Sequence, residues 1–157
     1  MASVEVGFTA LPAHVRTARL IALAVARRAG VPEELLDEIK LAVGEACSRA
    51  VGINGTKAPD TPVRMSLRDG HGRFVIEVVD VGPLEASVGG PDLASLDPDA
   101  LTPAAVSTAP VPDPLPPGFS LAVISGLVEE VGVASEGDGT HVRMSWPAPD
   151  AYPDEQN

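Results

Sequence analysis

Residues 83–118 restrict the folding of this chain more than any other segment. They hold nine of the 16 prolines and five acidic residues, and no Lys, Arg or aromatic residue. Proline breaks helices and central strands, and the segment is too long and too proline-rich to pack as a regular element. We therefore expect a mobile loop, with the core built from the residues on either side of it.

Length and composition favour one folded domain. The chain has 157 residues, of which 45% are hydrophobic but only 3% aromatic. A chain of this length buries enough surface to form a single core, here a largely aliphatic one. We expect a single domain over residues 1–146 and an acidic, flexible tail over residues 147–157.

The charge distribution argues against binding to nucleic acid. The formal net charge is −11, and the 11 basic residues form no cluster along the sequence. Neutralising a phosphate backbone requires such a cluster. The first residues lack the basic and apolar regions of a signal peptide, and no apolar run approaches the ~20 residues of a membrane span. We expect a cytoplasmic protein that contacts neither nucleic acid nor membrane directly.

Four structural units are predicted before the loop. Proline suits the first turn of a helix, glycine often follows the last turn, and alternating apolar residues indicate strands. On these signals the units are a strand at Val4–Phe8, a helix from Pro12 to Gly30, a helix from Pro32 to Gly52 and the Asn54–Gly55 pair, and a hairpin of Val63–Leu67 with Arg73–Asp80.

After the loop, a helix and a second hairpin are predicted. Helical spacing relates Leu121, Ile124, Val128 and Val131. The closing hairpin places Val142, Met144 and Trp146 on one face, with Trp146 in the core. Antiparallel hairpins with helices between them imply a two-layer α/β (α+β) sandwich, in which a mixed, largely antiparallel sheet carries its helices on one face.

The single cysteine and the histidines suggest structural roles. Cys47 has Ala and Val neighbours and is expected to be a small buried hydrophobe. His14, His71 and His141 fall on different predicted elements without ligand spacing, so no metal site is expected from them.

Three motifs occur in the order and at the spacing of a known fold. They are "AVGEACSRAV" in the second helix, "VVDVGPL" at the end of the central hairpin and "PPGFSLAVISGLVEEV" opening the third helix. Together they resemble the GHKL-type ATPase fold, also called the Bergerat fold. The chain is most similar to the RsbW/SpoIIAB branch, in particular to degenerate, actinobacterial-like members, and the resemblance covers roughly Val4 to Trp146.

The resemblance implies a function in partner switching. Members of that branch are anti-sigma factors that sequester an alternative sigma factor. They also use ATP to phosphorylate a serine on a STAS-type antagonist, which otherwise strips the sigma factor away. The implied cofactors are ATP and ADP, the implied partners are a sigma factor and a STAS-domain anti-anti-sigma protein, and the family suggests a homodimer.

The resemblance also assigns roles to particular residues. Glu45 corresponds to the general base toward the serine hydroxyl. Asp80 corresponds to the carboxylate that accepts the adenine amino hydrogen, Gly82 allows the backbone to approach the base, and Thr140 joins the adenine-side network. Gly118 lies where phosphates meet the amino end of the third helix.

Three positions depart from the family pattern. Arg49 replaces the asparagine that supplies an oxygen to magnesium, and a guanidinium has no acceptor with which to bind a metal. Leu84 and Ser120 replace glycines, which narrows the pocket. We expect weakened or altered nucleotide binding in which Arg49 reaches a phosphate as a fixed cation, doubtful use of magnesium, and low or absent kinase activity.

Simpler alternatives remain open for the same residues. Glu45 and Arg49 match an acid–base pair four residues apart on a solvated helix face. Asp80 precedes a glycine by two positions and suits the start of a turn. At the level of function, the main alternative to an anti-sigma factor is an active serine kinase with a rebuilt pocket. The catalytic domain of a sensor histidine kinase fits less well, because we expect no upstream helix with a phosphoacceptor histidine.

Overall fold

The computed structural model describes residues 3–82, 123–137 and 139–149. The expected loop at 83–118 therefore lies outside the described residues, as does most of the expected tail at 147–157. The same holds for Leu84, Gly118, Ser120 and Leu121.

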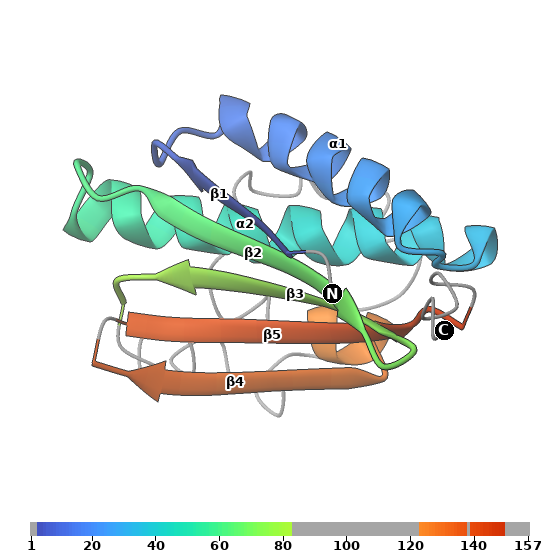
Figure 1. Cartoon of the computed structure of the whole chain (residues 1–157). Helices are drawn as coiled ribbons and strands as arrows, with labels where there is room; N and C mark the ends of the chain where they lie inside the picture. Colours follow the sequence, from blue (N-terminus) through green and yellow to red (C-terminus); the bar gives the residue numbers. More distant parts are fainter. Residues whose placement is uncertain (1–2, 83–122, 138, 150–157) are drawn as a thin grey trace, which may run out of the picture.

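Five strands form one sheet in the order β1-β2-β3-β5-β4 (Figure 1). Every neighbouring pair is antiparallel, so the described sheet is wholly antiparallel rather than mixed. The predicted two-layer α+β class is confirmed. The strands are β1 (Ser3–Phe8), β2 (Val63–Gly70), β3 (Arg73–Asp80), β4 (Glu130–Glu136) and β5 (Gly139–Pro147).

Two long helices, α1 (Ala13–Arg28) and α2 (Leu36–Lys57), pack together on one face of the sheet (Figure 1). A short 3-10 turn at Glu33–Leu35 precedes α2. Among the described residues, no helix is both long and apolar enough to cross a bilayer.

The core lies between α2 and the central strands. Alternate residues of these strands point toward the helices, as the period of two requires. The buried apolar strand residues are Val63, Met65, Leu67, Phe74, Ile76, Val78, Val142, Met144 and Trp146. The prediction that Trp146 is a core residue is confirmed, and its indole nitrogen donates to Glu38 Oε1 on α2 at 3.0 Å.

Helix α1 ends as predicted, at a glycine. Gly30 has a φ of 84°, which glycine adopts without strain. Its N–H donates to the Arg27 carbonyl, and the N–H of Val31 donates to the Ala26 carbonyl. This pair of bonds is the Schellman arrangement that closes many helices.

Helix α2 begins and ends later than predicted, at Leu36 and Lys57. Gly52, Asn54 and Gly55 do not end it, because the helix continues to Lys57. The buried side chain of Asn54 donates to the Thr61 carbonyl and accepts the N–H of Val81, so this residue ties the last turns of α2 to the chain beyond. Such tertiary contacts outweigh the weak helix propensity of Gly and Asn.

The two predicted hairpins are confirmed with changed boundaries. His71 and Gly72 both have positive φ, 55° and 73°, and form a two-residue turn, so β2 extends to Gly70 while β3 keeps its predicted bounds. The third helix ends earlier than predicted: among the described residues it covers 123–127, and the strand that contains Val131 begins at Glu130. Val131 lies in β4 opposite Met144, and with Val133 it packs against the core at strand periodicity.

The predicted burial of Cys47 is confirmed and has a chemical consequence. The side chain is completely buried in α2, and this burial raises the pKa of the thiol to about 12. The thiolate is the reactive form, and almost none of it is present near pH 8.

We therefore expect Cys47 to resist an aromatic disulfide reagent at pH 8 in the folded protein and to react fully after denaturation in guanidinium chloride. The released thiolate is measured by absorbance. Rapid labelling of the native protein would contradict the burial described here.

Candidate functional site

Arg49 and Asp80 form an ion pair inside the protein. Arg49 lies on α2, Asp80 is the last residue of β3, and Arg49 Nη1 donates to Asp80 Oδ2. Neither side chain is exposed to solvent. The pair thus joins the helix layer to the sheet at the end of β3, where the resemblance predicts a nucleotide site.

The second oxygen of Asp80 organises the turn that follows β3. Asp80 Oδ1 accepts the N–H of Gly82 at 2.7 Å. The carbonyl of Gly82 then accepts the hydroxyl of Thr140 on β5, also at 2.7 Å. The structure therefore brings together four of the predicted site residues, and Asp80 also begins a turn, as the simpler alternative had it.

Two glycines allow the chain to pass closely around Asp80. A Cβ atom at Gly82 would lie 2.6 Å from Ile53 Cγ2, a side-chain atom of α2. At Gly139 a Cβ atom would lie 1.8 Å from the carbonyl oxygen of Asp80, and the φ of 134° is itself unfavourable for other residues. The site is therefore tightly packed on both sides of the strand end.

Asn54 is a member of this site that the sequence analysis missed. Its Oδ1 accepts the N–H of Val81 at 2.9 Å, directly between Asp80 and Gly82, and its Nδ2 donates to the Thr61 carbonyl at 3.1 Å. The amide is fully buried. An amide side chain on a helix face that is otherwise apolar could have identified Asn54 as a site residue. The sequence analysis assigned it to the end of the helix instead.

Glu45 lies on α2 one turn before Arg49, and it is half-buried. Arg49 is only 1% exposed, so the interpretation of this residue as part of a solvated helix face is wrong. Gly118 and Ser120 lie outside the described residues. The site therefore consists, in its described part, of the Arg49–Asp80 cluster, with Glu45 one helical turn earlier on α2.

The electrostatics of the pair explain why it persists. Removing two charges from water costs several kcal/mol per ion, and their attraction compensates only when further hydrogen bonds satisfy the groups. Asp80 meets this condition through Arg49 and the Gly82 N–H. Loss of one partner alone leaves a buried charge without its counter-charge.

An adenine base does not fit this arrangement as it stands. The role assigned to Asp80 requires a carboxylate that the amino group of the base can reach, but this carboxylate is fully buried and already accepts bonds from Arg49 and Gly82. Arg49 offers only donors, so it cannot take the metal-binding role of an asparagine. Among the residues that the structure describes, no group of three or more His, Cys, Asp or Glu is placed to hold a metal ion.

The ion pair can be tested by a double-mutant cycle. Asp80→Asn keeps an acceptor for the Gly82 N–H but removes the negative charge that faces the buried Arg49, so we expect a loss of about 3–5 kcal/mol in the free energy of unfolding. Adding Arg49→Met should recover much of that loss, because the buried charge is then gone. Urea denaturation followed by circular dichroism measures both.

Asp60→Asn is the matched control, because Asp60 is exposed and its substitution should change stability by less than about 0.5 kcal/mol. Additive costs for Asp80→Asn and Arg49→Met would show that the two side chains do not interact.

Comparison with known proteins gives the fold a family. Residues 8–146 match the model of the histidine kinase-like ATPase domain. Among solved structures, the RsbU and RsbW domains of a Mycobacterium tuberculosis protein are similar, with a TM-score of 0.62 and 15% identity. The match covers 94% of this chain and 32% of that chain, and at this identity it supports the fold alone. No curated protein matches the sequence. The family match spans most of the chain, and the chain belongs to the histidine kinase-like ATPase domain family.

Proposed function

We propose that the chain is an anti-sigma factor. In this proposal it sequesters an alternative sigma factor and releases it when a STAS-type anti-anti-sigma protein competes. Its nucleotide site is degenerate, so ATP and ADP bind weakly and without a need for magnesium, and its serine kinase activity is low or absent. The membership of the ATPase-domain family and the likeness to an RsbW domain support this class of function.

The observation that carries the proposal is the ion pair of Arg49 with Asp80. The carboxylate that the family resemblance assigns to adenine is here bonded to a side chain of the protein itself. A base that used Asp80 would have to displace the guanidinium, leaving a buried arginine without its counter-charge. The pair therefore favours a domain whose surfaces still bind partners but whose nucleotide affinity is reduced.

The same residue weakens the case for catalysis. Phosphoryl transfer depends on positioning and on charge stabilisation, for which a metal ion is usually essential. Arg49 occupies the position that the family pattern gives to a metal-binding asparagine, and a guanidinium cannot donate an electron pair. Each ~1.4 kcal/mol of lost transition-state stabilisation lowers the rate tenfold, so the loss of a metal ligand amounts to orders of magnitude.

An active serine kinase is the second candidate. Glu45 favours it, because the resemblance assigns the role of general base to this half-buried carboxylate. A carboxylate there serves catalysis only if a nucleotide binds within reach of it. The two candidates therefore differ first in nucleotide binding and then in transfer to a STAS-domain substrate.

Calorimetric titration with ATP and ADP, in magnesium and in chelator, separates the two candidates. We expect weak binding to the native chain that chelator does not change, and magnesium-dependent binding to Arg49→Asn, because the amide restores an oxygen ligand and frees Asp80. Arg27→Asn removes an exposed arginine of α1 and should behave like the native chain. Tight, magnesium-dependent binding to the native chain would overturn the proposed nucleotide site.

Partner binding is tested with purified alternative sigma factors from the source organism. We expect a stable complex that inhibits transcription in a reconstituted assay and that a STAS-domain protein dissociates. Because the chain carries a net charge of −11, association should slow as salt is raised. With labelled ATP, little phosphate should reach the STAS-domain protein; rapid transfer would favour the kinase, and no sigma binding would refute the anti-sigma assignment.

A further inference from the structure

A pocket lies between the two long helices. The first half of α1 and the second half of α2, which run in opposite directions, form it together with the turn before α1 (Figure 1). Its volume is about 460 Å³, which is within the range of sites for small molecules. Buried apolar side chains form part of its lining: Ala10, Val15 and Val51.

This pocket carries positive charge without a compensating acid. Arg16 and Arg19 belong to its lining, and no acidic residue of the described part of the chain does. The lining residues all fall within residues 6–32 and 46–59, and neither segment contains an Asp or a Glu, although the chain has 22 acidic residues. The nearest acid along α2 is Glu45, which lies outside the lining. The surroundings of this pocket therefore favour an anion.

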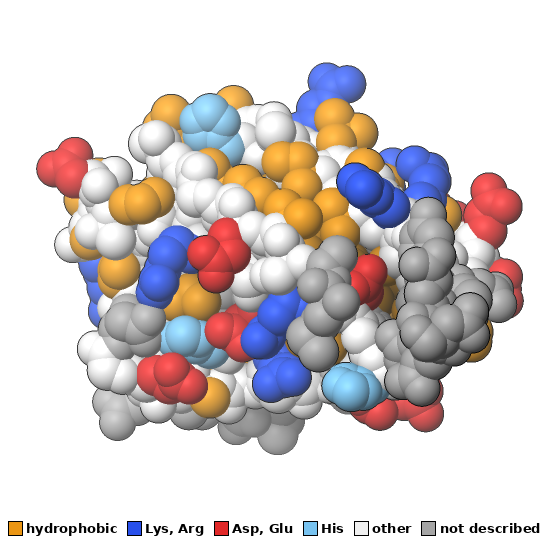
Figure 2. Space-filling model, in the orientation of Figure 1, with side chains coloured by type: hydrophobic (Ala, Val, Ile, Leu, Met, Phe, Trp, Pro, Cys, Tyr) orange, Lys and Arg blue, Asp and Glu red, His pale blue; other side chains and the backbone are white. Residues whose placement is uncertain are grey.

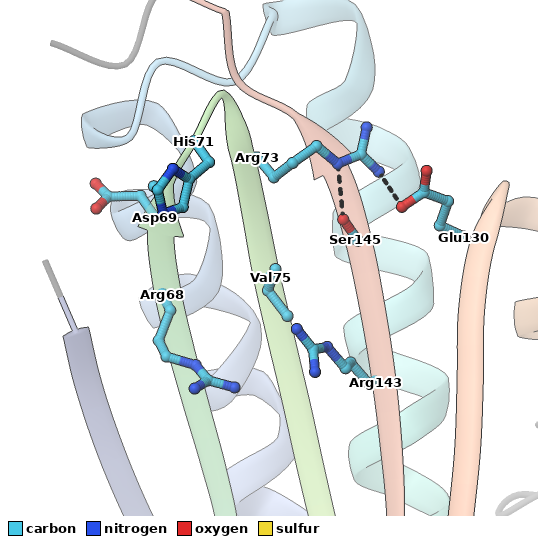
Figure 3. A pocket seen from close by; sticks show the side chains of 9 residues that line it. Arg68, Asp69, His71, Arg73, Val75, Glu130, Arg143 and Ser145 are labelled. Carbon is cyan, nitrogen blue, oxygen red and sulfur yellow. Dashed lines mark hydrogen bonds and ion pairs between the residues drawn. The ribbon is translucent and has the colours of Figure 1, made fainter. Parts of the chain in front are cut away.

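The face of the sheet opposite the helices differs from this pocket, because it mixes charges of both signs. Figure 2 shows acidic and basic side chains beside one another over the strands. In the pocket at the β2–β3 turn, Arg73 Nη2 lies 2.6 Å from Glu130 Oε2, and Asp69 is part of the same lining (Figure 3). The charges of that face compensate each other locally, whereas those between the helices do not.

Arg19 lies against α2 because Gly44 has no side chain. A Cβ atom at Gly44 would lie 2.7 Å from Arg19 Nη2, so the guanidinium would have to move away. In its present position Arg19 is half-buried, and its Nε is buried without a hydrogen-bond partner in the described structure. Buried donors normally bond an acceptor, so this guanidinium has binding capacity that the described residues do not use.

Two further donors line the same pocket. Arg16 is exposed and precedes Arg19 by three residues, which places both side chains on one face of α1. Among the described residues, neither arginine forms an ion pair. Ser48 contributes a half-buried hydroxyl from α2, while the hydroxyl of Thr56 already donates to the Gly52 carbonyl at 3.0 Å. Two guanidinium groups and one hydroxyl therefore remain for a ligand.

We propose that this pocket, named here the Arg16–Arg19 site, binds a phosphate monoester of a small molecule. The two guanidinium groups match the nearly double negative charge of the phosphate, and its three terminal oxygens accept from both of them and from Ser48. The apolar side chains of Val15 and Val51 would contact the organic part of the ligand. A carboxylate fits less well, because it has a single charge and only two oxygens.

The Arg16–Arg19 site is separate from the Arg49–Asp80 cluster. Arg49 extends from α2 to the end of β3, where it bonds Asp80, whereas Arg19 lies against Gly44 on the side of α2 that packs on α1. The proposal therefore rests neither on nucleotide binding nor on the anti-sigma function. Either result can stand without the other.

The test is a titration of the full-length chain, labelled with ¹³C in its methyl groups, with phenyl phosphate. We expect chemical-shift changes centred on Val15 and Val51, and an affinity at least about fivefold higher than for benzoate or for inorganic phosphate, because the first lacks a charge and the second lacks an organic part. This map uses the native chain, so it does not depend on any variant.

Arg16→Gln and Arg19→Gln should each lower the affinity for phenyl phosphate about tenfold, since each removes a charge-assisted contact. Arg27→Gln is the matched control, because Arg27 is an exposed arginine of the same helix that does not line the pocket. Its affinity should fall by less than about twofold. Unchanged thermal melting shows that the variants remain folded.

Four outcomes would overturn the proposal. One is no binding of phenyl phosphate, or an equal loss in Arg27→Gln. Another is equal affinity for benzoate or inorganic phosphate, because the pocket would then select negative charge alone. The third is a set of shift changes centred on Ile53, beside Gly82, which would move the phosphate to the Arg49–Asp80 cluster. The fourth is tighter binding of a phosphoserine peptide, which would assign the site to a modified protein instead of a small molecule.

Discussion

The buried ion pair between Arg49 and Asp80 sets the geometry of everything around it. A charge placed inside a protein must be paired and hydrogen-bonded, so the pair fixes how α2 lies against the end of β3. The remaining oxygen of Asp80 then holds the Gly82 N–H, and the Gly82 carbonyl holds Thr140 on β5. One helix and two strands are thereby joined at a single point.

This arrangement changes what the fold can do. The same helix and strand end would serve a nucleotide if Asp80 were open to a base and if an oxygen ligand stood at position 49. Here the Asp80 carboxylate is bonded to the side chain of Arg49, and Arg49 itself offers only hydrogen-bond donors. The architecture of an ATPase domain is present, and the end of β3, where the resemblance predicts a nucleotide, is closed by a structural contact.

The sequence predicted the architecture better than the site. Alternation in β2, β3 and β5 and the glycine after α1 are strong local signals, and the structure confirms them. The ends of α2 and of the third helix were misjudged because tertiary contacts, those of Asn54 and of Val131, outweigh local propensity. The Arg49–Asp80 bond was also missed, since residues 31 positions apart reveal their pairing only once the fold is known. Each charge had been weighed separately, although both lie in segments that are otherwise buried.

A crystal structure of the native chain grown with excess ADP and magnesium is the most direct test of the central claim. The account predicts that Arg49 remains bonded to Asp80 and that no adenine amino group contacts the carboxylate. An adenine base bonded to Asp80, with the Arg49 guanidinium displaced from it, would contradict the account.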